Sequence, residues 1–157
     1  MSTIKIRLAH ISDLESLNQL MFKLHDYHHV EQPKHIKPAL EIEQVKSIAS
    51  YLDNPECLVY VAVEDGRIIG FITGHFCELV SIISKPVLMG SVDELYILPE
   101  KRKTKVASEL MSKLEDMFED FGVKRIFVEV WNFNQSAISF YQNAGFNHHI
   151  HWLCKEL

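Results

Sequence analysis

The sequence contains no run of about 20 apolar residues, so nothing in it predicts a membrane-spanning helix. Its start, Met1 to His10, lacks the basic region and apolar core of a secretory signal, and we expect a cytoplasmic protein. Positive charge is not in excess, because 16 Lys and Arg stand against 21 Asp and Glu, a formal net charge of -5. Nucleic-acid binding needs a basic face, so we expect no nucleic-acid partner. An acidic balance instead favours a cationic or amine-bearing partner.

Cysteine is scarce, and its spacing excludes two classes of small protein. Cys57, Cys77 and Cys154 are odd in number and far apart, and no Cys-x-x-Cys pair occurs. Neither a disulfide framework nor a zinc ribbon is therefore indicated. All three lie in apolar or strand-like surroundings, so we interpret them as reduced residues in or near the core. No neighbouring group would activate a catalytic thiol.

What the sequence does contain is the pattern of one globular domain over residues 1–157. Hydrophobic residues make up 47% and charged residues 24% of the chain, enough to bury a full core. Period-2 runs and helical stripes predict six strands and four helices. The strands are expected at 4–8, 58–64, 67–76, 87–98, 125–130 and 146–155, and the helices at 12–30, 41–52, 104–121 and 134–144.

Local signals mark several of these boundaries. Asp65-Gly66, between two apolar runs, is a strong β-hairpin signal. Ser12 followed by Glu15 is a capping-box pattern for the first helix, and Gly122 is placed to end the third. The late strand–helix–strand unit implies a parallel or mixed sheet covered by helices on both faces. The expected fold is a three-layer α/β/α sandwich with a mixed central sheet.

The most informative stretch covers residues 93–108, which read as a strand, a tight turn and the start of a helix. The free N–H groups and dipole of a helix start attract anions. Four basic residues crowd this turn in an otherwise acidic chain: Lys101, Arg102, Lys103 and Lys105. Either an anion such as a phosphate sits there, or the turn is a solvated basic loop.

This stretch resembles the acetyl-CoA-binding segment of the GNAT superfamily of N-acetyltransferases. That segment has a strand, Pro-Glu-x-Arg, and a loop Arg/Gln-x-x-Gly-x-Gly/Ala that opens a long helix. Arg102 matches the leading Arg, Lys105 the middle Gly and Ala107 the final small residue. Residues 134–146 are similar to a second family segment, Asn-x-x-Ala-x-x-Phe-Tyr-x-x-x-Gly-Phe. The resemblance implies the GNAT fold, acetyl-CoA as co-substrate, no metal, and acetyl transfer to a primary amine of a small molecule, peptide or protein.

Two departures concern the phosphate loop, where Lys103 and Lys105 replace the usual glycines. Glycine lets the backbone approach phosphate closely. The Cβ of Lys105 would crowd a diphosphate, or its ammonium would instead reach a phosphate oxygen. The alternative function is therefore a catalytically impaired binding or regulatory module with the same fold.

The resemblance assigns cofactor contacts to the strand end, the loop, the helix start and the later helix. The free backbone edge at the strand end is expected to pair with pantetheine. The assigned residues are Leu95, Tyr96, Ile97, Leu98, Arg102, Lys103, Thr104, Lys105, Val106, Ala107, Ser108, Asn134 and Tyr141. Asn134 is equally readable as a plain helix N-cap.

Aminolysis of a thioester needs a neutral amine, whose usual pKa near ~10 leaves it protonated. A carboxylate, acting directly or through water, can remove that proton. Glu94 is the first candidate, and Asp93, on the opposite face of the strand, is the alternative; either could be a surface carboxylate. Tyr141 matches the family tyrosine that protonates the departing thiolate, although it could be a core aromatic.

The acceptor region and the histidines complete the expectations. In the family, the first helix and its following loop border the acceptor pocket, so Tyr27, His28, His29 and Glu31 are expected to touch substrate. Trp131 and Phe133 flank the last β–α turn, and core packing is the preferred interpretation of Trp131. The histidines show no His-Glu-x-x-His spacing, so we expect no metal. Relatives that pair through sheet edges make a homodimer plausible.

Overall fold

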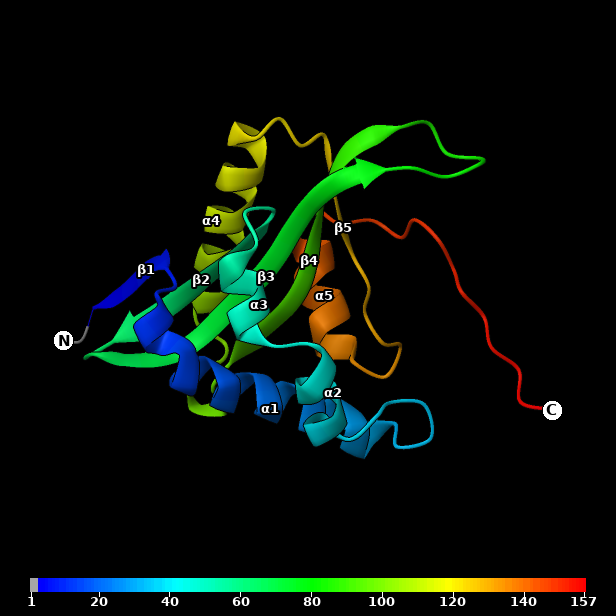
Figure 1. The fold of residues 1–157 in the computed structure, drawn as a ribbon. Coiled ribbons are helices and arrows are strands. Elements are labelled where there is room, and N and C mark those ends of the chain that lie inside the picture. The colour runs from blue at the N-terminus through cyan, green and yellow to red at the C-terminus, as the bar shows by residue number, and fades with distance from the viewer. Residues whose placement is uncertain (1–2) are drawn as a thin grey trace.

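The computed structural model describes residues 3–157 and contains one five-stranded mixed sheet (Figure 1). Met1 and Ser2, where the N-terminal expectation starts, lie outside the described residues. The strands follow the order β1-β2-β3-β4-β5, and only the β4–β5 pair is parallel. Their bounds are β1 Ile4–Leu8, β2 Cys57–Glu64, β3 Arg67–Leu79, β4 Val87–Ile97 and β5 Arg125–Val128.

Helices cover both faces of the sheet, as the sequence predicted. They are α1 Leu14–Glu31, α2 Ala39–Val45, α3 Ile48–Asp53, α4 Val106–Asp120 and α5 Gln135–Asn143. Successive residues of β3 point to opposite layers: Thr73 bonds to a network that includes Tyr51 of α3, whereas a Cβ on Gly74 would meet Leu114 and Phe118 of α4. The architecture is therefore the expected three-layer sandwich.

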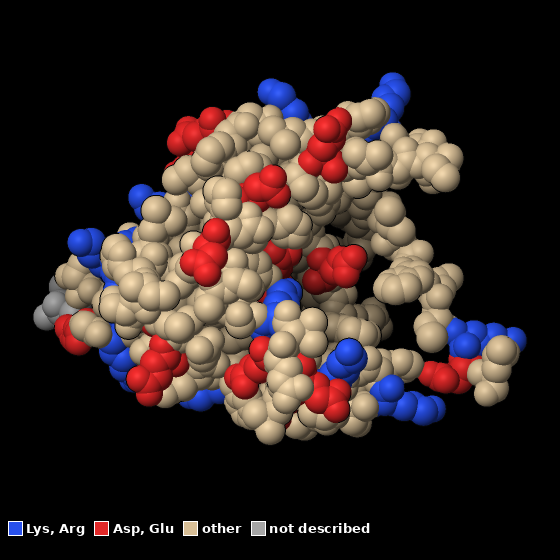
Figure 2. Space-filling view, in the orientation of Figure 1, with Lys and Arg blue, Asp and Glu red and all other residues tan. Residues whose placement is uncertain are grey.

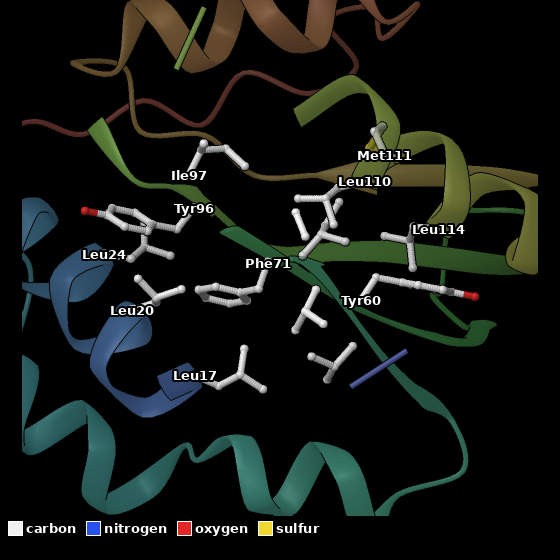
Figure 3. Packing of buried hydrophobic residues seen from close by; sticks show 14 of the residues in the cluster. Leu17, Leu20, Leu24, Tyr60, Phe71, Tyr96, Ile97, Leu110, Met111 and Leu114 are labelled. Carbon is white, nitrogen blue, oxygen red and sulfur yellow. The ribbon is translucent and has the colours of Figure 1, made fainter. Parts of the chain in front are cut away.

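The core fills both spaces between sheet and helices (Figure 3). Leu17 of α1 and Phe71 of β3 are fully buried on one side, and Phe118 of α4 is fully buried on the other. Phe118 lies so close to the sheet that a Cβ on Gly90 would come within 2.7 Å of its ring. The glycine therefore permits a contact that no larger residue allows.

The hairpin between β2 and β3 turns where the sequence placed it. Asp65 has φ 50 and Gly66 has φ 75, so both turn residues are in the left-handed region. That is the backbone of a type I′ turn, which matches the twist of the flanking strands. Gly122, with φ 83, follows the end of α4, which confirms its predicted position.

The first helix starts differently from the prediction. A 3-10 turn, Ile11–Asp13, precedes α1, and the Asp13 carboxylate accepts a 2.7 Å bond from the backbone N–H of His10. Asp13 also receives two bonds from Arg7, which lower the pKa of its carboxyl group. The predicted capping box at Ser12 is wrong, because α1 begins only at Leu14, after the 3-10 turn, and Asp13 is the residue at its N-cap.

The single helix expected over 41–52 is wrong, since the chain forms α2 and α3 with a break between them. At the break, Lys46 is extended, with φ -130 and ψ 110. Ser47 then caps α3 by accepting a 3.3 Å bond from the backbone N–H of Ser50. A serine that bonds to the backbone ahead of it competes with continuation of the preceding helix.

The final strand expected over 146–155 is also wrong. Residues 146–157 form neither helix nor strand, and Figure 1 shows them running away from the sheet. Trp152 is 94% exposed, and Cys154, expected near the core, is exposed too. A period-2 pattern favours a strand, but a strand exists only when a neighbour accepts its backbone bonds. Within residues 3–157, no strand pairs with the outer edge of β5.

Two kinds of feature, a membrane-spanning helix and a metal-binding cluster, are absent from the described residues. No helix among residues 3–157 is long and apolar enough to cross a membrane. No group of three or more His, Cys, Asp or Glu side chains in that range is arranged to hold a metal ion.

Candidate active site

The site begins where β4 changes its partners. Thr73 pairs with Glu94 and Gly74 with Val92, so Asp93 is the extra residue of a β-bulge. On the other edge, pairing with β5 ends at Val92 and Val128, although β4 continues to Ile97. The two parallel strands therefore part beyond Val92. A bulge beside such an opening turns the side chains of β4 out of simple alternation.

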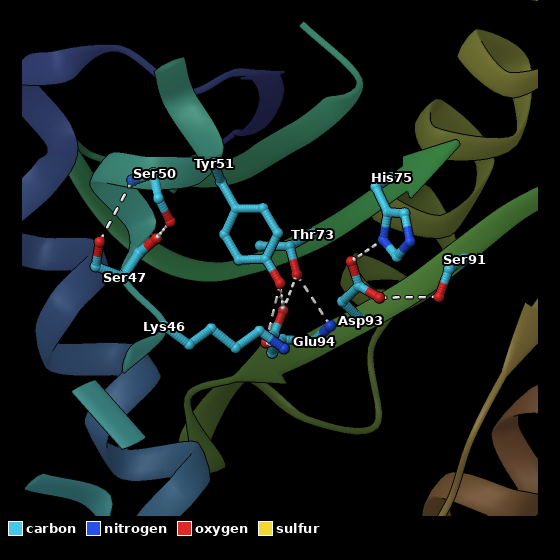
Figure 4. A network of polar contacts seen from close by, with 9 residues as sticks. All are labelled: Lys46, Ser47, Ser50, Tyr51, Thr73, His75, Ser91, Asp93 and Glu94. Atoms are coloured by element: carbon cyan, nitrogen blue, oxygen red, sulfur yellow. Dashed lines mark hydrogen bonds and ion pairs between the residues drawn. The ribbon is translucent and has the colours of Figure 1, made fainter. Parts of the chain in front are cut away.

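Glu94 lies in a buried polar network below α3 (Figure 4). Its side chain is only 2% exposed and accepts a 3.1 Å bond from the hydroxyl of Tyr51 and a further bond from the hydroxyl of Thr73. Thr73 also accepts a 2.9 Å bond from the backbone N–H of Glu94. These bonds fix the carboxylate in place. Burial, and then the charge of Glu94, raise the pKa of Tyr51 far above its usual range, so its hydroxyl remains a donor.

A cation completes this network. The ammonium of Lys46 lies 2.5 Å from Oε1 of Glu94 and 5.8 Å from the centre of the Tyr51 ring. Lys46 comes from the break between α2 and α3, and its side chain is 43% exposed. The carboxylate is therefore bonded on its inner side by neutral hydroxyls and on its outer side by the protein's own amine.

Asp93 occupies separate surroundings. Its carboxylate lies 2.7 Å from Nδ1 of His75 and accepts a 2.8 Å bond from the hydroxyl of Ser91 (Figure 4). It thus forms a neighbouring Asp–His pair, outside the Glu94 network. Both carboxylates stand beside the strand opening, as expected, but only Glu94 is buried.

Tyr141, on α5, is 7% exposed and has its ring packed edge-on against Phe140 and Phe146. Within residues 3–157, no group forms a hydrogen bond with its hydroxyl. Burial, and then the charge of Glu94, raise the pKa of the Tyr141 phenol, so it stays protonated at neutral pH.

The loop between β4 and α4 carries Lys103 and Lys105, where the resemblance expects glycines. Lys103 adopts φ 60, the left-handed conformation that glycine usually supplies, whereas Lys105 has an ordinary φ of -83. Thr104 donates a 2.8 Å bond to the carbonyl of Lys101 and shapes the turn. The first amides of α4, including those of Ala107 and Ser108, have no carbonyl one turn earlier and can bind an anion.

The four basic residues of this region separate into two pairs. Lys101 forms an ion pair with Glu64 of β2, and Arg102 folds back to donate a 2.8 Å bond to the carbonyl of Ile97. The Arg102 guanidinium also lies 5.2 Å from the centre of the Tyr96 ring. Lys103 and Lys105 are exposed. Only this second pair has its charge directed to solvent beside the amides of α4.

Asn134 begins α5 as an N-cap. Its side-chain oxygen accepts bonds of 3.2 Å from the backbone N–H of Ala137 and 3.3 Å from the hydroxyl of Ser136. The plain capping interpretation therefore describes the contacts of this residue, and its role towards a cofactor stays a prediction.

The residues expected at the acceptor lie at the end of α1. The rings of Tyr27 and His28 each lie 6.0 Å from the ring of Phe133, which belongs to the loop before α5. Burial lowers the pKa of His28. His29 shares a 2.6 Å bond with the carbonyl of Ile36 and holds the loop that follows the helix, whereas Glu31 is exposed. The end of α1 and the β5–α5 loop therefore form one aromatic border.

Sequence reasoning missed or misjudged several residues near this site. Trp131, preferred as a core residue, is 45% exposed. Thr73 and Tyr51 were not identified, although Thr73 lies opposite Glu94 once the hairpin register is set. His25 of α1 was not singled out beyond the histidine spacing. Its ring is buried, Nε2 has no hydrogen-bond partner within residues 3–157, and burial with the charge of Lys46 lowers its pKa to about 4.

Comparisons with known proteins show the family to which this chain belongs. The acetyltransferase (GNAT) family matches residues 21–146. An uncharacterized N-acetyltransferase of Mycobacterium tuberculosis is 30% identical over 115 residues, which span 73% of this chain and 69% of the relative. A crystal structure of an acetyltransferase from Vibrio fischeri is 55% identical, with a TM-score of 0.68, over 82% of this chain and 97% of that chain.

A third protein shares the fold at low identity. The aminoglycoside N-acetyltransferase AAC(6')-Iy, solved in complex with CoA, has a TM-score of 0.70 and 19% identity over 100% of this chain and 96% of its own. The chain belongs to the GNAT family of acetyltransferases, whose members use acetyl-CoA. It is an N-acetyltransferase.

Proposed function

We propose that the protein transfers the acetyl group of acetyl-CoA to a primary amine by direct attack. The single observation that carries this proposal is the buried carboxylate of Glu94 beside the point where β4 parts from β5. Tyr141, a buried phenol of α5 whose pKa is raised by burial and by the charge of Glu94, is the proposed acid. One group suits removal of a proton from the amine, and the other suits protonation of the thiolate.

The proposed cofactor site follows the parted edge of β4 and continues into α4. The backbone of Leu95 to Leu98 would pair with pantetheine, in the way an added strand pairs with an open edge. The diphosphate would lie on the loop 102–105 and the amides of residues 106–108. The left-handed backbone of Lys103 supports this fit, as do the exposed ammonium groups of Lys103 and Lys105. Asn134 would contribute its side-chain N–H₂.

In the proposed reaction, the acceptor ammonium first gives a proton to Glu94, directly or through a water molecule. The neutral nitrogen attacks the thioester carbonyl carbon, the carbon–sulfur bond breaks, and the nitrogen releases its second proton to solvent as the amide forms. The electron pair stays on sulfur, which takes a proton from Tyr141. Asp93, held by His75 and Ser91, remains the alternative base.

For the acceptor we propose the amine of a small molecule or of a peptide or protein. It would enter along the border that holds Tyr27, His28, His29 and Glu31. The aminoglycoside enzyme AAC(6')-Iy has been solved with a bisubstrate analogue, CoA-S-monomethyl-acetylneamine, which supports a small-molecule amine as acceptor. On the face shown in Figure 2, acidic and basic side chains are mixed and no broad basic area occurs, which suits a small amine better than a nucleic acid.

We also propose a homodimer, in the cytoplasm, in which the segment after α5 pairs with a second copy. Ile150, Trp152 and Leu153 are exposed, Ile150 and Trp152 are separated by one residue as on one face of a strand, and the outer edge of β5 has no partner strand within residues 3–157. Three free cysteines suit a reducing compartment. Sedimentation tests the dimer: full-length protein should sediment as a dimer and a chain ending at residue 146 as a monomer.

The main proposal is tested by ligand binding and then by turnover. Acetyl-CoA should raise the melting temperature, because a ligand that binds only the folded state stabilises it. Native mass spectrometry should show one CoA bound for each chain. A panel of polyamines, aminoglycosides, amino acids and peptides, followed by thiol release, then identifies the acceptor. No thermal shift at millimolar acetyl-CoA would contradict the proposal.

A further inference from the structure

The contact between Lys46 and Glu94 places a primary amine of the protein itself against the proposed base. The two charged atoms are 2.5 Å apart. The remaining bonds of the Glu94 carboxylate go to the buried hydroxyls of Tyr51 and Thr73. Lys46, at 43% exposure, therefore covers the side of the carboxylate that faces solvent (Figure 4). An external amine would have to approach from that side.

The chemistry of Lys46 equals that of an acceptor. A lysine side chain is a primary amine with a usual pKa of about 10.4, so it arrives as an ammonium and must lose a proton before it attacks. Glu94, its ion-pair partner, is the group proposed to take that proton. Lys46 thus stands where the reaction requires the acceptor nitrogen.

We propose that Lys46 is an acetylation site of this enzyme, modified within its own chain at the Glu94 carboxylate; the inference rests on the function proposed above. The Lys46 ammonium passes a proton to Glu94, and Nζ attacks the carbonyl carbon of acetyl-CoA. The nitrogen–carbon bond forms, the carbon–sulfur bond breaks, and Nζ releases its second proton to solvent. The electron pair stays on sulfur, which is protonated by Tyr141. The products are acetyl-Lys46 and free CoA.

The position of Lys46 in the fold gives the side chain the freedom that this step requires. Its backbone is extended between two short helices of seven and six residues. Its stem lies partly in solvent, and its ring contact with Tyr51 is at 5.8 Å. Other lysines lack this placement: Lys101 is paired with Glu64 of β2, and Lys37 is exposed on the turn before α2.

Peptide mass spectrometry after incubation with acetyl-CoA, without added amine, tests the proposal. Lys46 should gain an acetyl group at least about tenfold faster than Lys37, because a group held at the site reacts at high effective concentration. Its rate constant should not change when the protein is diluted. Equal labelling of Lys46 and Lys37, or a rate that rises with protein concentration, would overturn the inference.

Two variants separate enzymatic from chemical labelling. Glu94→Gln should reduce labelling of Lys46 to the rate of Lys37, whereas uncatalysed labelling would be unaffected. Lys37→Arg is the matched control and should leave labelling of Lys46 unchanged. Lys46→Arg keeps the positive charge and should lose the label at that peptide.

The failure of this inference is distinguishable from failure of the proposed function. If acetyl-CoA raises the melting temperature and an external amine is acetylated while Lys46 stays unmodified, only the Lys46 inference is wrong. If acetyl-CoA produces no thermal shift and no amine is acetylated, the proposed function fails and the inference fails with it.

Discussion

The two sides of the site differ in how far the protein's own groups satisfy their hydrogen bonds and charges. On the side covered by α1–α3, the Glu94 carboxylate is buried and bonded to two hydroxyls and an ammonium. On the other side, the loop 102–105 is exposed, and two of its lysines point their charge to solvent. The fold therefore preorganises the proposed proton transfer. Binding of the cofactor depends instead on exposed lysines and amides whose interactions form only when the ligand is present.

The largest expected effect breaks the buried side. Glu94→Gln keeps the shape but removes the base, and kcat should fall by about 10³-fold, within the range for general base catalysis. The KM for acetyl-CoA should change little, because the loop is untouched. Steady-state kinetics with Asp93→Asn as the matched control checks this. If Asp93→Asn lost the greater activity, the roles of the two carboxylates would be reversed.

Tyr141→Phe should act next. It removes the proposed proton donor while retaining the ring that packs between Phe140 and Phe146, so kcat should fall by about 10²-fold with an unchanged melting temperature. Tyr60→Phe, at another buried tyrosine, is the control for loss of a hydroxyl. An unaltered kcat in Tyr141→Phe would leave the thiolate to be protonated by water.

The pH dependence of the free energy of unfolding tests the buried side of the site through His25. The pKa of His25 is lowered to about 4 in the folded protein, by burial and by Lys46, from an unfolded value near about 6.5. Stability is therefore highest above pH 6.5, and about 2 kcal/mol is lost as the pH falls towards 4, because only the unfolded chain takes up the proton. Urea denaturation across this range measures the slope.

The His25→Gln variant supplies the comparison for that slope. It should show a flatter dependence between pH 6.5 and 4, since glutamine does not titrate. His10→Gln replaces an exposed histidine and should retain the slope of the original protein. An equal slope in the His25 variant would assign the titration to another group.

The smallest effect concerns the exposed side. Lys105→Gly should weaken acetyl-CoA binding by about two- to fivefold at low salt, the size of a solvent-exposed charge interaction, and the difference should shrink in salt. Calorimetry with Lys113→Ala as control measures it. A gain in affinity would show that the Lys105 side chain crowds the phosphates. The exposed side of the site would then hinder cofactor binding instead of assisting it.

Local patterns predicted the elements whose stability is local. The Asp65-Gly66 turn and the helix that ends before Gly122 lie where the sequence placed them. The break at Lys46 was missed because a serine cap competes there with helix continuation. The strand at 146–155 was wrong because strand formation depends on a partner, which a sequence pattern does not specify.

The site divides in the same way. Glu94 was chosen from its place on the strand and Tyr141 from a motif, and their catalytic roles stay predictions. Thr73 and Lys46 could not be predicted, since each reaches Glu94 through tertiary structure, one across a strand pair and the other from a helix break. Neither a sequence motif nor a hydrophobic pattern around Lys46 predicts its contact with Glu94.

The early end of the β4–β5 ladder has a consequence for the free protein. Beyond Val92, and within residues 3–157, the last residues of β4 pair with a strand on one edge only. The backbone N–H and C=O groups on the other edge are left to bond with solvent or with a ligand. When acetyl-CoA pairs with that edge as proposed, it lies as a sixth strand, and amide exchange at Leu95 and Ile97 should slow. The exchange rate of these two amides would therefore report occupancy of the proposed acyl-donor site.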